Sequence, residues 1–198
     1  LPLVNVGNSK AFYVKASPDK SKILLFNIVK TKSSFFVRFT VMDDSLRILK
    51  RNIFTLTDVS NVSLKSIKVS NQGSVVAAIG HEGGYDNQDY NFDKYTIFAY
   101  NPSTNTISEQ MLMSQDAILK NIITEVTNQS GLVYVTACYK SIKDKRDIGL
   151  LNQTIDLGAN TVLLNSKMPF DEEILQRSQN NEFKTWQDKA SLVRPRRI

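Results

Sequence analysis

The chain has 198 residues, of which 41% are hydrophobic and 22% charged, a globular composition that excludes disordered, collagen-like and coiled-coil classes. One cysteine, Cys138, and one histidine, His81, are too few for a disulfide framework, a cysteine-based zinc cluster or the familiar catalytic triads. Three of the charges behind the net +6 stand in the last five residues, so the charge balance gives little support for a nucleic-acid partner.

Three similar turns mark an internal repeat. They read Ser-Pro-Asp-Lys at 17–20, Ser-Asn-Gln-Gly at 70–73 and Thr-Asn-Gln-Ser at 127–130, with spacings of 53 residues (17 to 70) and 57 residues (70 to 127). A short alternating segment precedes each turn, at 12–16, 64–69 and 119–126. A more uniformly apolar run follows each turn, at 23–29, 75–79 and 132–138. The pattern predicts that each turn joins two antiparallel strands.

Two further strands complete each unit. The segments rich in β-branched and aromatic residues are 35–41 and 46–56, then 95–100 and 106–112, then 150–157 and 161–164. Asp, Asn, Gly, Pro and Ser stand between them, as expected of turns. We therefore expect three four-stranded antiparallel sheets in tandem.

The second strand of each unit is apolar on both faces, which indicates that a neighbouring sheet covers each side. Together with a repeat of about 50 residues, this predicts an all-β chain forming a partial β-propeller of about three four-stranded antiparallel blades. A two-sheet sandwich of about twelve strands is the alternative. We place a lead-in at 1–10 and the blades at 11–58, 59–113 and 114–167.

The pattern changes after Lys167. Met168, Pro169 and the acidic residues that follow are typical of a first helical turn, and no strand alternation occurs over 172–189. We expect a C-terminal helical segment, an insert, followed by a basic tail, over residues 168–198.

Three stretches carry a resemblance to a known family. They read YVKASPDKSKILLF at 13–26, FTVMDDSLRIL at 39–49 and IKVSNQG at 67–73. Over about residues 11–190 the chain resembles a family of largely uncharacterised, β-propeller-like cell-envelope repeat proteins of Bacteroidota. The resemblance implies export to the periplasm or cell surface after removal of a signal peptide, and further blades after the insert. It implies no catalytic residues.

The chain starts without methionine and stops where the resemblance implies a further blade, so we expect a processed protein or a portion of a longer chain. Propellers typically use four to eight blades, and three would leave apolar faces and strand edges open at both ends. We expect the remainder of the same chain, a second copy or a protein partner to cover them. No apolar run approaches the roughly 18 residues of a membrane-spanning helix.

The strongest candidate site is the link between the second and third strands of the second unit, residues 80–93. Aromatic residues stand there among polar ones, a mixture that suits protein or sugar recognition, although packing against the blade edge is an equal alternative. The corresponding link of the third unit, residues 139–147, is basic. The candidate partner-binding residues in the two links are Tyr85, Tyr90, Phe92, Lys143, Lys145 and Arg146.

Two weaker candidate sites lie in the same link, residues 80–93. Asp89, Asn91 and Asp93 have the alternate spacing of calcium-loop ligands, but the turn glycine of such a loop is missing. His81 beside Glu82 could act as an acid and base pair, but no nucleophile accompanies it. We therefore assign no catalytic residue, no metal and no cofactor.

These observations favour a non-catalytic propeller-type scaffold or protein-binding module in a bacterial cell-envelope assembly, with recognition carried by the blade loops. One alternative is a propeller hydrolase or lyase whose catalytic residues lie outside this segment. Another is attachment to a polysaccharide or a nucleic acid through the basic loops.

Overall fold

The structure is a computed structural model that describes residues 11–86, 89–113, 116–127, 131–143 and 148–171. This part of the chain is all β and forms twelve strands. The first four are β1 (Phe12–Ala16), β2 (Lys22–Lys30), β3 (Ser34–Asp43) and β4 (Ile48–Thr57). The next four are β5 (Val62–Val69), β6 (Val75–Asp86), β7 (Asp89–Asn101) and β8 (Thr106–Met113). The last four are β9 (Ala117–Val126), β10 (Leu132–Ser141), β11 (Ile148–Asp156) and β12 (Thr161–Pro169).

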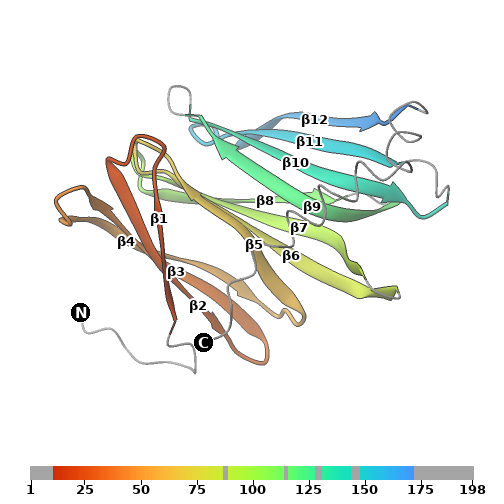
Figure 1. Cartoon of the computed structure of the whole chain (residues 1–198), viewed down its shortest axis with the longest axis horizontal. Helices are drawn as coiled ribbons and strands as arrows, with labels where there is room; N and C mark the ends of the chain where they lie inside the picture. The colour runs from red at the N-terminus through yellow and green to blue at the C-terminus, as the bar shows by residue number, and fades with distance from the viewer. Residues whose placement is uncertain (1–10, 87–88, 114–115, 128–130, 144–147, 172–198) are drawn as a thin grey trace, which may run out of the picture.

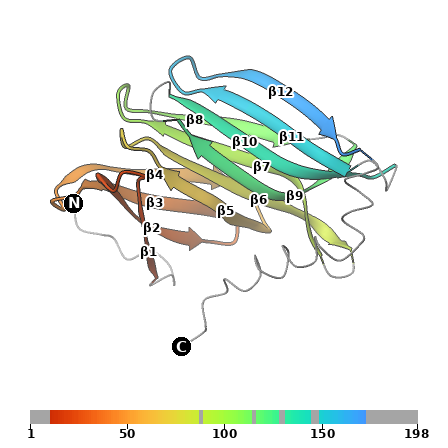
Figure 2. The ribbon, with the colours of Figure 1, turned by 45° about the horizontal axis from the view of Figure 1, so that its top comes forward.

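Each group of four consecutive strands forms an antiparallel meander. Strands β1 to β4 make a sheet of their own, while the other two meanders are joined by one pairing between β7 and β9, Phe92 opposite Leu119. Figure 1 shows the meanders following one another from red to blue with their sheets fanned apart. In Figure 2 the first and third lie on either side of the second. The prediction of a partial β-propeller with three four-stranded blades is confirmed.

One hydrogen-bond pattern closes the three repeated turns. In each, a hydroxyl oxygen accepts a hydrogen bond from the backbone N–H that begins the next strand, at 2.9, 3.1 and 3.1 Å. The backbone N–H of the hydroxyl residue donates in return to the carbonyl oxygen of that partner, at 2.9 Å in all three turns. The pairs are Ser17 with Lys22, Ser70 with Ser74, and Thr127 with Leu132. The middle turn is one residue shorter, so equivalent strand residues lie 52 (22 to 74) and 58 (74 to 132) positions apart.

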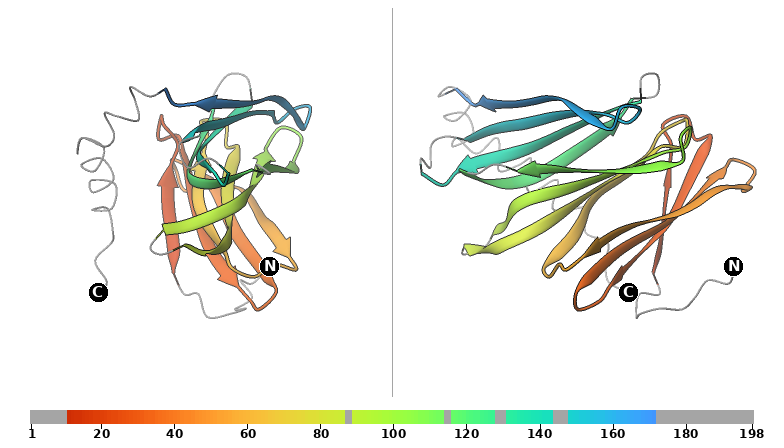
Figure 3. Two further views of the ribbon diagram at one scale, coloured as in Figure 1. Left: turned by 90° about the vertical axis from the view of Figure 1, so that its right-hand side faces the viewer. Right: turned by 180° about the vertical axis from the view of Figure 1, so that it is seen from behind.

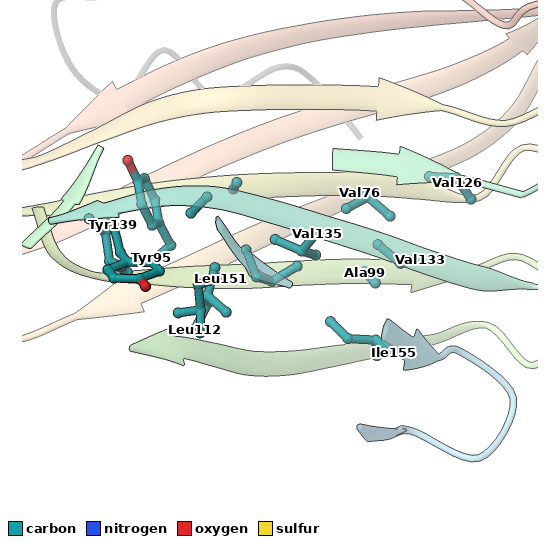
Figure 4. Packing of buried hydrophobic residues seen from close by; sticks show 14 of the residues in the cluster. Val76, Tyr95, Ala99, Leu112, Val126, Val133, Val135, Tyr139, Leu151 and Ile155 are labelled. Atoms are coloured by element: carbon teal, nitrogen blue, oxygen red, sulfur yellow. The ribbon is translucent and has the colours of Figure 1, made fainter. Parts of the chain in front are cut away.

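The hydrophobic core lies between the blades and forms two clusters. One joins the first and second blades, where Phe54 stacks on Phe98 with ring centroids 5.2 Å apart and Phe39 lies 5.7 Å from Tyr100. The other joins the second and third blades, as Figure 4 shows. The second strand of the middle blade, β6, contributes side chains to both clusters. It is apolar on both faces because a neighbouring sheet covers each of them.

The stretch 80–93 differs from the irregular link that the sequence predicts. Strands β6 and β7 continue into it as a long hairpin, in which Tyr85 pairs with Tyr90 and Asp86 with Asp89. The register shifts twice, between His81 and Glu82 and again before Tyr85. Such bulges absorb extra residues while the strands stay paired, so a stretch rich in glycine and aspartate remains extended.

The C-terminal boundary also differs from the expectation. Strand β12 continues to Pro169, so Met168 and Pro169 belong to the last strand and not to a helix. Phe170 and Asp171 are not helical either. The remainder of the expected helical segment, 172–198, and the lead-in at 1–10 lie outside the described residues.

Candidate interaction surfaces

The strand registers identify residues that hold the same place in each blade. On the fourth strands these are Phe54, Leu112 and Met168, whose exposed fractions are 0%, 1% and 51%. The first two are covered by the following blade, whereas no described residues follow the third blade. The outward face of the third blade, formed by β10, β11 and β12, is therefore an open blade face.

The second strands give the same result. The equivalent residues are Leu24, Val76 and Tyr134, of which the first two are fully buried and Tyr134 is 45% exposed. Figure 3 shows the third blade from behind, with β12 at its outer edge. In the described part of the chain β12 pairs with β11 and with no other strand.

The open face of the third blade is more polar than the covered faces. Where the first blade has the facing pair Phe26 and Phe39, the third has Thr136 and Asn152, and the Thr136 hydroxyl donates to the Asn152 side-chain oxygen at 2.8 Å. Exposed Tyr134 and Met168 lie beside this polar pair. The face therefore combines apolar anchors with hydrogen-bonding groups, the mixture of a protein-binding surface rather than of a core.

The opposite end of the arc, the outward face of the first blade, also mixes apolar and polar residues. Ile23, Leu25 and Met42 hold the places of Val75, Ala77 and Tyr100, which the preceding blade buries. All three are partly accessible to solvent. The facing pair Asn27 and Arg38 lies on the same face. The expectation of apolar faces at both ends is thus only half right, because polar residues stand among the apolar ones on both end faces.

The aromatic residues Tyr85, Tyr90 and Phe92 lie on the two arms of the β6–β7 hairpin. Their backbone is strand, but their side chains lie outside the described part of the structure. The choice between recognition and packing against the blade edge therefore stays a prediction.

The basic link of the third blade is described as far as Lys143. Its ammonium lies 3.8 Å from the Asp116 carboxylate, and both side chains are largely exposed, so the pair contributes little stability. Lys145 and Arg146 lie outside the described residues. The pair does bring the links before β9 and before β11 to the same end of the blade.

The two weaker candidate sites lie on paired strands of the second blade. His81 lies with Nε2 2.8 Å from the Thr96 hydroxyl, and Ser63 donates to the Glu82 carboxylate at 3.4 Å. Both residues lie on β6. Asp89 to Asp93 fall in β7 rather than in a loop. Among the described residues, no three His, Cys, Asp or Glu side chains come together in a way that could hold a metal ion.

The sequence predicts the inner strands of the blades, β1, β5 and β9, but does not single out their charged residues as a candidate site. Lys15 on β1, Lys68 on β5 and Glu125 on β9 hold equivalent places, each two residues before a repeated turn. All three line one hollow of about 260 Å³, and Lys68 forms an ion pair with Glu125 across two blades. A charged residue two positions before each turn was visible in the sequence, but only the register shows that the three strands meet.

Solved structures with a similar arrangement share little sequence with the chain. A tryptophan-to-alanine mutant of Synechocystis apocarotenoid oxygenase is 12% identical, with a TM-score of 0.48 over 83% of this chain and 40% of that one. An ACO/RPE65 chimera is 12% identical, with a TM-score of 0.48 over 80% of this chain and 38% of that one. The chain thus spans about two fifths of the length of these proteins. No protein-family model and no curated protein matches it.

Among the described residues, no helix is long and apolar enough to cross a membrane.

Proposed function

We propose that the chain is a non-catalytic propeller-type scaffold whose open blade faces bind a protein partner or the remainder of the same polypeptide. The observation that carries the proposal is the contrast between Phe54 and Leu112, which are buried, and Met168, which is 51% exposed in the same place. The position that a following blade buries in the first two blades is thus exposed in the third, within the described part of the chain.

The third blade supplies the chemistry of such an interface. Tyr134 provides a large, rigid anchor at low entropic cost, and Met168 provides an adaptable apolar one. The Thr136 and Asn152 side chains offer hydrogen bonds. Exposed Leu163 and Leu164 extend the apolar surface to the free edge of β12. A partner strand can pair with such an edge, so backbone hydrogen bonds would add to the side-chain contacts.

Site-specific photo-crosslinking in native cells tests this proposal. The photoreactive residue p-benzoylphenylalanine is placed at position 134, at position 168 and, as a control, at Ser103 in the exposed β7–β8 turn. We expect the same discrete product at 134 and 168 but not at 103, with the joined peptide identified by mass spectrometry. Absence of a product at both blade positions, or equal products at all three, would reject the proposal.

The two neighbouring links are proposed to add contacts at the blade ends. The triple variant Tyr85→Ala, Tyr90→Ala, Phe92→Ala and the triple variant Lys143→Gln, Lys145→Gln, Arg146→Gln are expected to weaken the crosslink at 134. A matched control is Lys32→Gln, in the exposed β2–β3 link. An unchanged crosslink yield in a triple variant would remove that link from the interface.

The compartment is part of the proposal. The resemblance to Bacteroidota cell-envelope repeat proteins supports a place in an envelope assembly, at the periplasm or cell surface, after removal of a signal peptide. Fractionation of the native source should recover the protein in the envelope fractions. Recovery with the cytoplasmic fraction would contradict this placement.

A further inference from the structure

The turn between β3 and β4 carries an exposed apolar patch at the end of the first blade. Leu46, Ile48 and Leu49 have exposed fractions of 65%, 51% and 50%. In Figure 1 this turn projects at the left-hand end of the molecule, beyond the corresponding turns of the other two blades. We call these three residues the turn patch.

Leu46 has a backbone conformation that leucine rarely adopts. In the turns between the third and fourth strands, the residues with positive φ are Leu46 at 62°, Asn105 at 59° and Asn160 at 54°. Asparagine tolerates this left-handed region because its short polar side chain can hydrogen-bond to the nearby backbone, whereas leucine is strained there. Since most of Leu46 is exposed, burial within the chain does little to offset the strain. Such an outlier points to a function for the side chain.

The end of the blade that carries the turn patch has a surplus of positive charge. Lys22 lies opposite Asp43 in the β2–β3 pairing, so the β1–β2 turn is beside the β3–β4 turn. Over residues 17–22 and 43–51, which make up the two turns, five basic side chains stand against three acidic ones. The basic residues are Lys20, Lys22, Arg47, Lys50 and Arg51, and the acidic ones are Asp19, Asp43 and Asp44. The ion pair of Arg47 with Asp43 is included in this balance.

We propose that the turn patch inserts into the surface of an anionic phospholipid bilayer, with Leu46 and Leu49 below the headgroups and Lys50 and Arg51 at their level. Transfer of the exposed leucine side chains out of water then offsets the strain at Leu46. Basic residues close to a negatively charged bilayer add an attraction that salt weakens. Their long side chains can lie along apolar surface while the charge stays among the headgroups.

The composition of the turn patch favours a bilayer over a protein pocket. Residues that anchor protein interfaces are predominantly tryptophan, tyrosine and arginine, and leucine is under-represented among them. The turn patch is aliphatic throughout and sits on a projecting turn. A bilayer accepts such side chains without a matching cavity, and the surplus of positive charge selects anionic lipid.

Co-sedimentation of the full chain with vesicles tests the proposal. One vesicle preparation contains phosphatidylcholine alone, and the other contains phosphatidylcholine and phosphatidylglycerol in equal parts. We expect the chain to sediment with the anionic vesicles, less so as salt rises, and to bind the neutral vesicles about ten-fold more weakly. No binding to the anionic vesicles, or equal binding to both, would overturn the proposal.

The variant Leu46→Asn separates bilayer contact from folding. It gives the first blade the residue type found at Asn105 and Asn160, so relief of strain should raise the melting temperature by about 2 °C. Its affinity for anionic vesicles should fall about ten-fold, because one buried leucine is lost. A matched control is Ile123→Asn on β9, which is also 65% exposed and should keep the affinity. Undiminished binding by Leu46→Asn, an equal loss in the control, or a lower melting temperature for Leu46→Asn would each contradict the proposal.

The basic residues and the identity of the partner are tested separately. The double variant Lys50→Gln, Arg51→Gln should lose most of the preference for anionic vesicles, and an unchanged preference would remove the charge from the proposal. In native cells, p-benzoylphenylalanine at position 49 should label phospholipid. A discrete protein adduct there instead would show that the turn patch docks in a protein pocket and would overturn the proposal. The photo-crosslinks at positions 134 and 168 do not depend on this outcome.

Discussion

The facing pair Thr136 and Asn152 shows that equivalent positions have different roles in different blades. The equivalent residues in the first blade are Phe26 and Phe39, which are buried, whereas Thr136 and Asn152 hydrogen-bond to one another on an open face. Groups that hydrogen-bond to one another suit a face that meets water or a partner, because their polar atoms stay satisfied in either case. The polar pair therefore belongs with the exposed Tyr134 as part of a surface.

Cys138 lies on the same open face and reports on its surroundings. Burial raises the pKa of the Cys138 thiol above its ordinary value of 9.0. Because the thiolate is the reactive form, we expect iodoacetamide to alkylate Cys138 more slowly at pH 8 than it alkylates free cysteine, with a midpoint above pH 9 in a rate-versus-pH profile. A midpoint at or below 9 would contradict this burial.

Asp43 stabilises the β3–β4 turn in a pH-dependent way. Its carboxylate accepts hydrogen bonds from the backbone N–H groups of Arg47 and Ser45 and from the Arg47 guanidinium, and these contacts lower the pKa of Asp43. A lowered folded-state pKa adds stability above about pH 4 that is lost as pH falls through the folded value. Asp43→Asn should therefore lower the melting temperature at pH 7 and make little difference at pH 2. An equal deficit at both values would show that charge plays no part.

At the scale of the element, the repeated turns depend on their hydroxyl groups. Ser70 is 2% exposed, and its hydroxyl accepts from the backbone N–H of Ser74. Removing a buried acceptor leaves that N–H without its side-chain partner, so Ser70→Ala should cost about 1 kcal/mol of unfolding free energy. Ser70→Thr keeps the acceptor and serves as the control in chemical denaturation. A loss of the same size in both variants would assign the effect to packing instead.

Strands and turns could be predicted from the sequence where the alternation of apolar and polar residues matches the two-residue period of a β-strand. The turns at Ser17, Ser70 and Thr127 were visible because Ser, Thr, Asn and Gly recur there, and the strands beside them alternate. The stretch 80–93 misled for a physical reason. Its glycines and acidic residues are typical of loops, but long-range pairing of β6 with β7, helped by two bulges, overrides the local preference.

The candidate surfaces needed information that a sequence does not hold. Side-chain types pointed to the links at Tyr85 and Lys143, yet exposure at Tyr134 and Met168 follows from what covers each blade. In the same way, Lys15 and Lys68 read as residues on the solvated faces of strands until the register brings their strands together. Residues at equivalent positions of the three blades can lie in three different environments, and only the three-dimensional structure distinguishes these environments.

At the scale of the whole molecule, three like blades pack face to face, and their covered faces form the core. In the described part of the chain, the outward face of the third blade stays open. One hydrophobic cluster lies between the first and second blades, and another lies between the second and third blades. Stability then depends on the junctions rather than on any one sheet. The same substitution at equivalent positions should therefore lower the unfolding free energy more where a following blade covers the side chain than where none does.

Chemical denaturation of Leu112→Asp and Met168→Asp, measured side by side, tests this arrangement most directly. Leu112 is 1% exposed, so a carboxylate there should cost more than about 3 kcal/mol of unfolding free energy. Met168 is 51% exposed, so the same change should stay within about 0.5 kcal/mol. If Met168→Asp unfolds the isolated chain as readily as Leu112→Asp does, the last face is a core and the three-blade arc with an open end is wrong.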